Sequence, residues 1–503
     1  MRSRKTFINI TTSLLLQLVV LICGFIVPKL IITNYGSKVN GLVASITQFL
    51  AYITLLESGF GPVVKAALYK PIANRDKKQI ASILKASEKF FRVIACIFLV
   101  YLLLLSVVYP LIINTEFDFV YTMSLVLILS ISTFAEYYFG MTYKLFLQAE
   151  QKRYITSIVH LVGTIINTIS IVILVRIHAS IHIVKLVSSF IFVLRPIFQN
   201  IYVKRKYNIN LKEADKNYKL EQKWDALAQH IAYIIHRNTD IAILTIFAPL
   251  VEVSVYSVHH AISGRITSII QAFTGGADAS FGDMIARGEK EQLNKSFSIY
   301  ELFYFTLTTI AYTCTLLLIV QFIRVYMRGV TDANYIRPLF GTLLVLGEFV
   351  WAVREPYNLI ILAAGHFKQI KKGAWVEAFV NIIISIALVW KYGIVGVAIG
   401  TLVAMTIRTI EFMYRTNRYI LERKQNSSIK RVGLIVIEVM LVVMLTKVLP
   451  NIEMTSYINW IKYALLIAVE SMIIVVPVNI IIYRKDAKGL WNIVKRNLVK
   501  KKA

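Results

Sequence analysis

The stretch RSRKTFINITTSLLLQLVVLICGFIVPKLIIT, residues 2–33, sets a pattern that the rest of the chain repeats. Three basic residues come first, and an apolar segment follows that is longer than the about 20 residues needed to cross a bilayer. The segment is too long for the apolar region of a signal peptide, and no small-residue cleavage pattern follows it. We therefore predict that residues 8–33 form a retained membrane-spanning helix.

The overall composition fits a chain built from such segments. Hydrophobic residues make up 57% of the 503 residues, and the mean hydropathy is +0.64. Within a bilayer every backbone polar group must be satisfied inside its own helix, so we predict an all-α polytopic membrane protein. The predicted spans are residues 8–33, 41–66, 90–113, 119–143, 155–175, 183–203, 224–247, 253–280, 297–322, 338–363, 374–390, 392–413, 432–446 and 457–483.

Basic residues alternate between the loops on the two sides of these spans. One side carries 39 Lys and Arg residues, whereas the other carries 7. The positive-inside rule then places both termini in the cytoplasm of a bacterium and the spans in its cytoplasmic (inner) membrane. The net charge of +28 is explained by this topology and by contact with anionic membrane lipids, so we expect no nucleic-acid partner.

Basic loops after the sixth and twelfth spans divide the chain. We predict an N-terminal six-helix lobe at 1–203, a cytoplasmic basic linker at 204–223, a second six-helix lobe at 224–417, and two extra helices with a basic cytoplasmic tail at 418–503. Because each lobe has an even number of spans, the two lobes have the same orientation. This predicts a parallel repeat about a pseudo-two-fold axis along the membrane normal.

The predicted span at 224–247 carries polar residues at helical spacing. His230, Tyr233, Arg237 and Asp240 fall within an arc of about 80° when each residue advances by 100°. A polar stripe in the middle of a membrane helix cannot face lipid. It either forms a structural ion pair between packed helices or lines a cavity, and the sequence leaves both interpretations open.

Arginines inside the spans suit a phosphate or diphosphate, because the guanidinium fork binds such groups bidentately. The predicted substrate-binding residues are Arg237, Arg265, Arg354 and Tyr233. Carboxylates and histidine near them could instead carry H⁺ or Na⁺. The candidates for ion coupling, or for the acidic part of a cavity, are Asp240, His230, Glu57, Glu355 and Asp278.

Lysines near the ends of spans need no cavity, since their long stems let the charge reach the headgroups. We expect this behaviour of Lys29, Lys65, Lys185 and Lys462. Charged residues deeper in other spans need a partner or a cavity. These residues are Glu136, Arg195, Arg408 and Glu411.

The sequence lacks the motifs of several other classes. It contains no G-x-x-x-x-G-K-[ST] nucleotide-binding loop and no H-E-x-x-H metal motif. Its three cysteines are scattered, so we expect neither a disulfide framework nor a metal cluster. We also expect no cofactor. The extracytoplasmic loops are too short to hold a catalytic domain. We therefore expect a transporter without its own ATPase, and not an enzyme.

Two stretches carry a resemblance to a known family. Residues 279–289, ASFGDMIARGE, follow the eighth predicted span, and residues 55–61, LLESGFG, end the second. Together with the arrangement of six, six and two spans, they resemble the Wzx-type polysaccharide-biosynthesis flippases, the O-antigen and teichoic acid exporter group. Their superfamily also includes multidrug and toxin extrusion transporters and lipid II flippases. The resemblance implies two lobes around a central cavity, alternating access, and undecaprenyl-diphosphate-linked oligosaccharide as the substrate.

The resemblance also implies cationic residues on helices 1, 2, 7 and 8, where Arg237 and Arg265 match. The first two spans offer only Lys29 and Lys65 near their ends, so we expect the second lobe to supply most diphosphate contacts. Polysaccharide polymerase or assembly proteins are the expected protein partners. Two alternatives stay open. One is a cation-coupled multidrug exporter of the same fold, and the other is a membrane glycosyltransferase or polysaccharide polymerase.

Overall fold

The computed structural model describes residues 2–57, 60–113, 117–215, 218, 239–271, 277–450 and 452–500. All regular secondary structure in these residues is helical, which confirms the predicted all-α class. The chain forms two compact units, Met1–Ser254 and Val255–Ala503. The predicted lobes and the linker at 204–223 stay a prediction.

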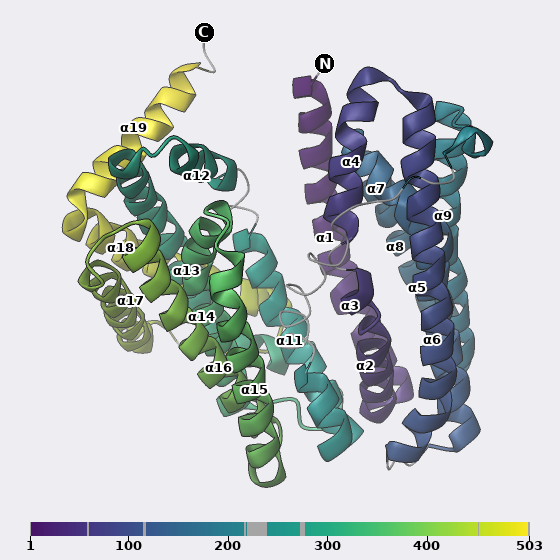
Figure 1. Ribbon diagram of the computed structural model, residues 1–503. Coiled ribbons are helices and arrows are strands. Elements are labelled where there is room, and N and C mark those ends of the chain that lie inside the picture. Colours follow the sequence, from purple (N-terminus) through teal and green to yellow (C-terminus); the bar gives the residue numbers. More distant parts are fainter. Residues whose placement is uncertain are drawn as a thin grey trace. The chain divides into compact units, whose positions relative to one another are not determined.

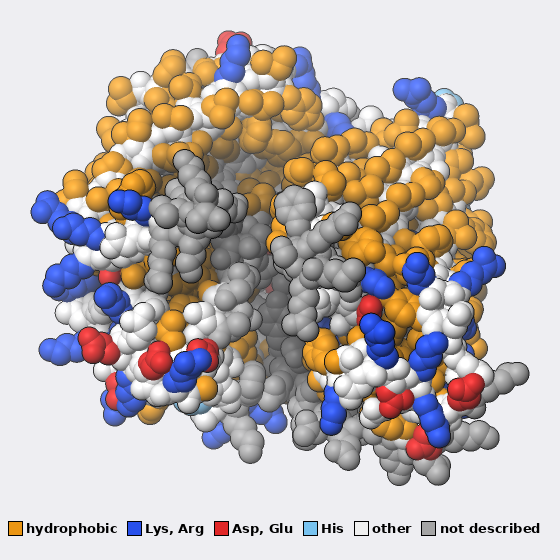
Figure 2. Space-filling view, turned by 90° about the horizontal axis from the view of Figure 1, so that it is seen from above, with side chains coloured by type: hydrophobic (Ala, Val, Ile, Leu, Met, Phe, Trp, Pro, Cys, Tyr) orange, Lys and Arg blue, Asp and Glu red, His pale blue; other side chains and the backbone are white. Residues whose placement is uncertain are grey.

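Ten of the described helices are long and apolar enough to cross a membrane, and the chain is a multi-pass membrane protein. Large hydrophobic side chains such as Leu103 and Ile473 are more than half exposed, as expected of surfaces that face lipid. Hydrophobic side chains cover much of the face in Figure 2, and basic side chains with acidic ones among them gather over part of it. The predicted span at 224–247 lies largely outside the described residues.

Unit 1 is a helical bundle (Figure 1). Its helices are α1 (Arg2–Tyr35), α2 (Ser37–Ala51), α3 (Thr54–Glu57), α4 (Phe60–Asn74), α5 (Lys77–Ile112), α6 (Phe119–Ala135), η1 (Glu136–Gly140), α7 (Met141–Ala149), α8 (Arg153–Arg176), α9 (Ile181–Tyr207) and η2 (Leu211–Glu213). Residues 239–247 are also helical and belong to this unit. The first residue of α1 and the turn between α4 and α5 lie at the same end of the unit (Figure 1), as the predicted topology requires.

Local sequence signals explain several boundaries in unit 1. The side chains of Asp76, Asp118 and Ser180 accept backbone hydrogen bonds at the starts of α5, α6 and α9, which is the usual role of an N-cap. Gly36 has a φ of 89° between α1 and α2, a conformation that favours glycine. The span predicted at 41–66 is interrupted by a turn at residues 52–53, between α2 and α3.

The fourth span contains a π-helical turn. α6, η1 and α7 form one long span, and η1 holds the π-helical geometry over five residues that begin at Glu136. Such a turn widens the helix and changes the direction of the side chains that follow it, and π-turns occur frequently at functional sites. This turn brings Glu136 and Tyr137 to the cavity described below.

Unit 2 contains α11 (Leu250–Gln271), which begins just before the unit boundary, and the helices that follow it. They are α12 (Ala277–Ala286), α13 (Lys290–Tyr326), α14 (Pro338–Ala363), α15 (Phe367–Tyr392), α16 (Ile394–Arg415), η3 (Thr416–Ile420), α17 (Asn426–Leu445), η4 (Thr446–Val448), α18 (Tyr457–Ile482) and α19 (Arg484–Lys500). The segment predicted as a basic tail is thus helical from Arg484 to Lys500.

Candidate functional site

Unit 1 contains a cavity between its helices. Its volume is ≈ 750 Å³, and its walls come from α1, α2, α3, α6, η1, α7, α8 and α9. The lining residues among those that the structure describes lie between Leu16 and Gln199, within unit 1. A cavity of this size lies within the range of about 300–1,000 Å³ that is typical of small-molecule sites.

Three helical faces supply most of the polar lining of this cavity. The face of α9 spans an arc of about 120° and consists of Lys185, Ser188, Ser189, Phe192, Arg195, Pro196 and Gln199. The face of α8 includes Arg153, Thr156, Ser157, His160 and Asn167. The span formed by α6, η1 and α7 contributes Ser132, Thr133, Glu136, Tyr137, Lys144 and Gln148. Spacings of three and four residues keep each set on one side of its helix.

Basic side chains outnumber acidic ones in the lining. The cations are Lys144, Arg153, Lys185 and Arg195, and the acids are Glu57 and Glu136. Lys144 Nζ donates to Glu136 Oε1 at 2.6 Å, and Tyr137 Oη donates to Glu57 Oε2 at 2.8 Å. Both carboxylates therefore have a partner within the unit, and the remaining charge of the cavity is positive.

Arg195 is held from two sides. Its Nη2 donates to Thr164 Oγ1 at 2.9 Å, and its guanidinium carbon lies 4.0 Å from the ring centroid of Phe192. Its Nε is buried and has no hydrogen-bond partner in the described part of the chain. Gly163 on α8 leaves room for the side chain, since an added Cβ there would lie 2.6 Å from Arg195 Nε. The side chain therefore packs closely against α8, and its positive charge is held at the wall of the cavity.

Two further cations of the lining are also without an acidic partner. No carboxylate of the described residues lies within ion-pair distance of Lys185 or Arg153. Lys185 was expected to reach the headgroups from its place near a span end, but its side chain lines the cavity instead. Asn167, which is 7% exposed, carries a buried Oδ1 with no hydrogen-bond partner in the same described range.

Several predicted site residues are not among the described residues that line this cavity. His230, Tyr233 and Arg237 lie outside the described residues, as does the side chain of Asp278, whose backbone belongs to α12. Asp240 is buried in the helical segment 239–247 of unit 1. Arg265 is half-buried on α11, and Glu355 on α14 accepts a hydrogen bond from Asn358 Nδ2 at 3.3 Å. Among the predicted residues, Glu57 lines the cavity.

Arg354 belongs to a buried ion-pair network of unit 2. Its Nη1 lies 2.7 Å from Glu377 Oε1, and Arg408 Nε lies 3.5 Å from Glu377 Oε2. Arg408 also pairs with Glu411, and its guanidinium lies over the ring of Phe412. The charge of Arg354 is therefore already compensated by α15, and this network joins α14, α15 and α16.

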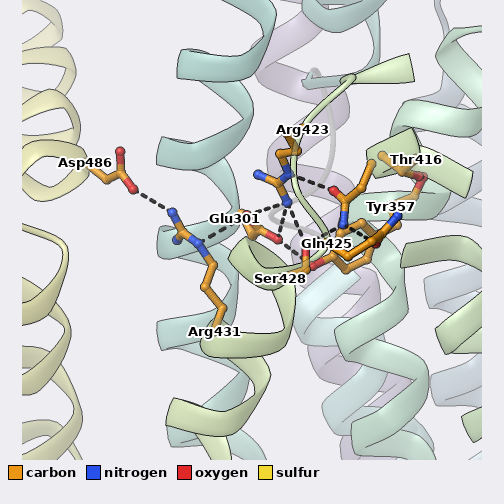
Figure 3. Close-up of polar contacts among 9 residues, drawn as sticks. Glu301, Tyr357, Thr416, Arg423, Gln425, Ser428, Arg431 and Asp486 are labelled. Atoms are coloured by element: carbon orange, nitrogen blue, oxygen red, sulfur yellow. Dashed lines mark hydrogen bonds and ion pairs between the residues drawn. The ribbon is translucent and has the colours of Figure 1, made fainter. Parts of the chain in front are cut away.

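A second buried network of unit 2 surrounds Glu301 on α13 (Figure 3). Glu301 is 0% exposed, and Arg423 Nη2 donates to its two carboxylate oxygens at 2.9 and 3.0 Å. Arg431 Nε lies 3.2 Å from Glu301 Oε2, and the Tyr357 hydroxyl donates to Oε1. Arg431 pairs in turn with Asp486, so the network connects α13, α14, α17 and α19.

The sequence singles out Arg195 as a charge that needs a partner or a cavity, but it does not join Arg195 to the other first-lobe cations. The predicted spans 119–143 and 155–175 leave Lys144 and Arg153 between them, but α7 continues to Ala149 and α8 begins at Arg153. The spacing of Glu136, Gly140 and Lys144 was the available signal, because it continues one polar face past the predicted end of the span.

No protein-family model and no curated protein matches the sequence. Solved structures do match. The chain is similar to the lipid II flippase MurJ in an inward closed conformation, with a TM-score of 0.66 and 14% identity over 93% of this chain and 98% of that one. It is also similar to an inward-facing multidrug resistance MATE family transporter of the MOP superfamily, with a TM-score of 0.60 and 13% identity over 82% of this chain and 96% of that one. The chain therefore has the fold that these transporters share.

Proposed function

We propose that this chain is a lipid flippase. It moves undecaprenyl-diphosphate-linked oligosaccharide repeat units from the inner to the outer leaflet of the bacterial cytoplasmic membrane, for the synthesis of cell-surface polysaccharide. Transport proceeds by alternating access without an ATPase of its own. The observation that carries the proposal is the unit 1 cavity, where Arg153, Lys185 and Arg195 have no carboxylate within ion-pair distance among the described residues.

The chemistry of the substrate fits this lining. A diphosphate offers several ionised oxygens, and a guanidinium binds such groups with parallel hydrogen bonds. Arg195 is therefore assigned to the diphosphate. The serine, threonine and glutamine side chains of the lining offer hydrogen bonds to sugar hydroxyls, while the lipid tail stays in the bilayer. Arg237, Arg265 and Tyr233 stay proposed substrate contacts, and Arg354 would join them only if its pair with Glu377 opened.

The remaining roles in the proposal follow from the topology and the acids. Both termini face the cytoplasm, where basic loops contact anionic lipids, and a polysaccharide polymerase or assembly protein receives the product. An H⁺ or Na⁺ gradient would act through the acids Glu57, Asp240, Glu355 and Asp278 and through His230.

Surface-glycan export in a flippase-null strain tests the function. Wild type is expected to restore export, whereas the double variant Arg237→Ala/Arg265→Ala should leave lipid-linked precursor in the inner leaflet at matched membrane expression. Several donor pathways should be tried, because the glycan is not defined by the cavity. If the well-expressed wild type restores none of them, the flippase proposal is wrong.

A multidrug exporter is the second candidate, and one observation favours it. Glu57 and Glu136 line the same cavity as the aromatic rings of Tyr137 and Phe192, a combination that suits organic cations. If this candidate is right, expression should lower the cellular accumulation of ethidium, and Glu57→Gln should abolish that effect. Unchanged ethidium accumulation alongside restored glycan export would exclude it.

Gly163 offers a test of how Arg195 is positioned. Gly163→Ala is expected to displace the guanidinium and to lower export by about tenfold, because a charge-assisted hydrogen bond is worth about 1.5–3 kcal/mol. Gly433→Ala is the matched control, since it lies in α17 with no atom within 4 Å of the added Cβ. Each substitution stabilises its helix by about 1 kcal/mol. If both variants lose export, the displacement of Arg195 is therefore not the cause.

A further inference from the structure

We infer that α19 is an interfacial helix that binds anionic phospholipid headgroups at the membrane surface beside the end of α18. Arg484, Lys488 and Lys495 pair with the headgroups, and Trp491 lies where the headgroups meet the acyl chains. The inference concerns the contact between the chain and the bilayer surface, so it goes beyond the proposed transport function and does not depend on which molecule is transported.

The neighbouring helices place α19 at the membrane surface. α18, which is long and apolar enough to cross a membrane, ends at Ile482, and α19 begins at Arg484. The middle of α19 packs closely against α13, because an added Cβ at Gly489 would lie 2.5 Å from Ile299 Cδ1. Ile299 belongs to the first turn of the span predicted at 297–322. α19 therefore stays at the membrane boundary at least as far as Gly489.

An ion pair helps to fix the orientation of α19 about its own axis. Asp486 accepts a hydrogen bond from Arg431 Nη2 on α17 at 2.5 Å (Figure 3). Arg431 also pairs with the buried carboxylate of Glu301, so it is held in place. Asp486 and Gly489 are three residues apart and lie on one side of the helix. These two contacts determine which side of α19 meets unit 2 and which side remains free.

The side of α19 away from these contacts is basic. With Arg484 taken as 0° and about 100° per residue, Lys495 and Lys488 fall at about 20° and 40°, whereas Gly489 and Asp486 fall at about 140° and 200°. The three basic side chains are exposed, and none of them forms an ion pair with a carboxylate of the described residues. They form a basic stripe that is available to an anionic partner.

Apolar side chains border this basic stripe. Trp491 falls at about 340° and is 68% exposed. Ala487 and Leu490, at about 300° and 240°, are half-buried. Tryptophan is enriched at membrane–water interfaces, and a helix with one basic face and one apolar face containing tryptophan lies in the plane of the interface. Such a position would cover Trp491 and keep the basic stripe at the level of the headgroups.

Charge and position favour anionic phospholipid over a protein as the occupant of this surface. Asp486 is the only acidic residue in α19, and it already pairs with Arg431. Basic residues directly after a membrane span attract the anionic lipids of the cytoplasmic leaflet, which is the side predicted for the C-terminus. The bilayer surface is already beside α19, because α18 ends there, whereas a protein partner would have to be recruited.

Quenching of tryptophan fluorescence by brominated lipids tests this contact in the full-length protein. The protein is reconstituted into phosphatidylcholine bilayers that contain equal fractions of either brominated phosphatidylglycerol or brominated phosphatidylcholine. The emission of Trp491 is the difference between wild type and Trp491→Phe. We expect phosphatidylglycerol to be enriched about fivefold around Trp491, which is the effect of one basic residue close to an anionic surface.

Two triple variants show whether the basic stripe causes this preference. Arg484→Gln/Lys488→Gln/Lys495→Gln should quench equally with both lipids, because it removes the three charges and keeps Trp491. The matched control removes three exposed lysines from α4 and α5 of unit 1 and should keep the preference of wild type. It is Lys70→Gln/Lys77→Gln/Lys78→Gln.

Each contrary outcome identifies the step that fails. If neither lipid quenches Trp491 in the wild type, α19 does not lie at the interface, and its free surface would suit a protein partner instead. Equal quenching by the two lipids in the wild type, or a preference that the α19 variant keeps or the control loses, would also overturn the inference. A wild type that prefers phosphatidylglycerol but does not flip the oligosaccharide lipid would refute the proposed function alone.

Discussion

Arg195→Ala is expected to lower glycan export about 10- to 100-fold while leaving the protein in the membrane. Hydrogen bonds to charged groups contribute about 1.5–3 kcal/mol each, and each 1.4 kcal/mol changes an equilibrium tenfold. Arg195 holds its place through Thr164 and Phe192, and its buried Nε is unpaired in the described residues, so alanine removes a binding group and not a structural ion pair. Export in the flippase-null strain, normalised to membrane expression, measures the effect.

Two further variants define the cause of this loss. Arg195→Lys keeps the positive charge but not the planar guanidinium group that binds phosphate bidentately. It should therefore restore only part of the export that Arg195→Ala loses. Arg176→Ala removes an exposed arginine at the end of α8 and should leave export unchanged. Export near the wild-type level in Arg195→Ala, with expression confirmed, would show that the cavity does not bind the substrate through this residue.

Glu301→Gln should destabilise the protein by about 3–5 kcal/mol, because removing one partner of a buried ion pair leaves uncompensated charge. Here two arginines, Arg423 and Arg431, would lose the carboxylate that holds them in unit 2. The measurement is the thermal midpoint of the purified protein in detergent, followed by the fluorescence of its tryptophans.

A matched substitution at an exposed pair provides the control. Glu422 lies 2.6 Å from Lys290, but the two side chains are 57% and 65% exposed. Glu422→Gln should therefore cost no more than about 1 kcal/mol. Equal thermal midpoints for Glu301→Gln and Glu422→Gln would show that the buried network does not stabilise the unit.

The sequence predicts individual helices well where local signals mark their ends. The span predicted at 338–363 coincides with α14, since Pro338 occupies the first turn and Gly365, with a φ of 69°, follows the last. Hydropathy could not predict the interruption at residues 52–53 between α2 and α3, because the residues around it are apolar. It also could not predict the π-turn η1, which depends on packing.

The site was harder to predict than the helices. Whether Lys185 snorkels or lines a cavity depends on α8 and on the span formed by α6, η1 and α7, which are distant from it in sequence. Likewise the partner of Arg354 is Glu377 on the next helix, and no spacing within one span reveals that pair. Glu57 was found because an acid in an apolar segment stands out in the sequence itself.

The most direct test of the central claim is flipping by the purified protein. Proteoliposomes would carry undecaprenyl-diphosphate-linked oligosaccharide in both leaflets, and glycan that becomes accessible to a membrane-impermeant glycosidase would be followed with time. We predict that wild type exposes the inner-leaflet glycan and that Arg195→Ala resembles protein-free vesicles. Wild type that leaves the inner-leaflet glycan protected, as in protein-free vesicles, would contradict the account.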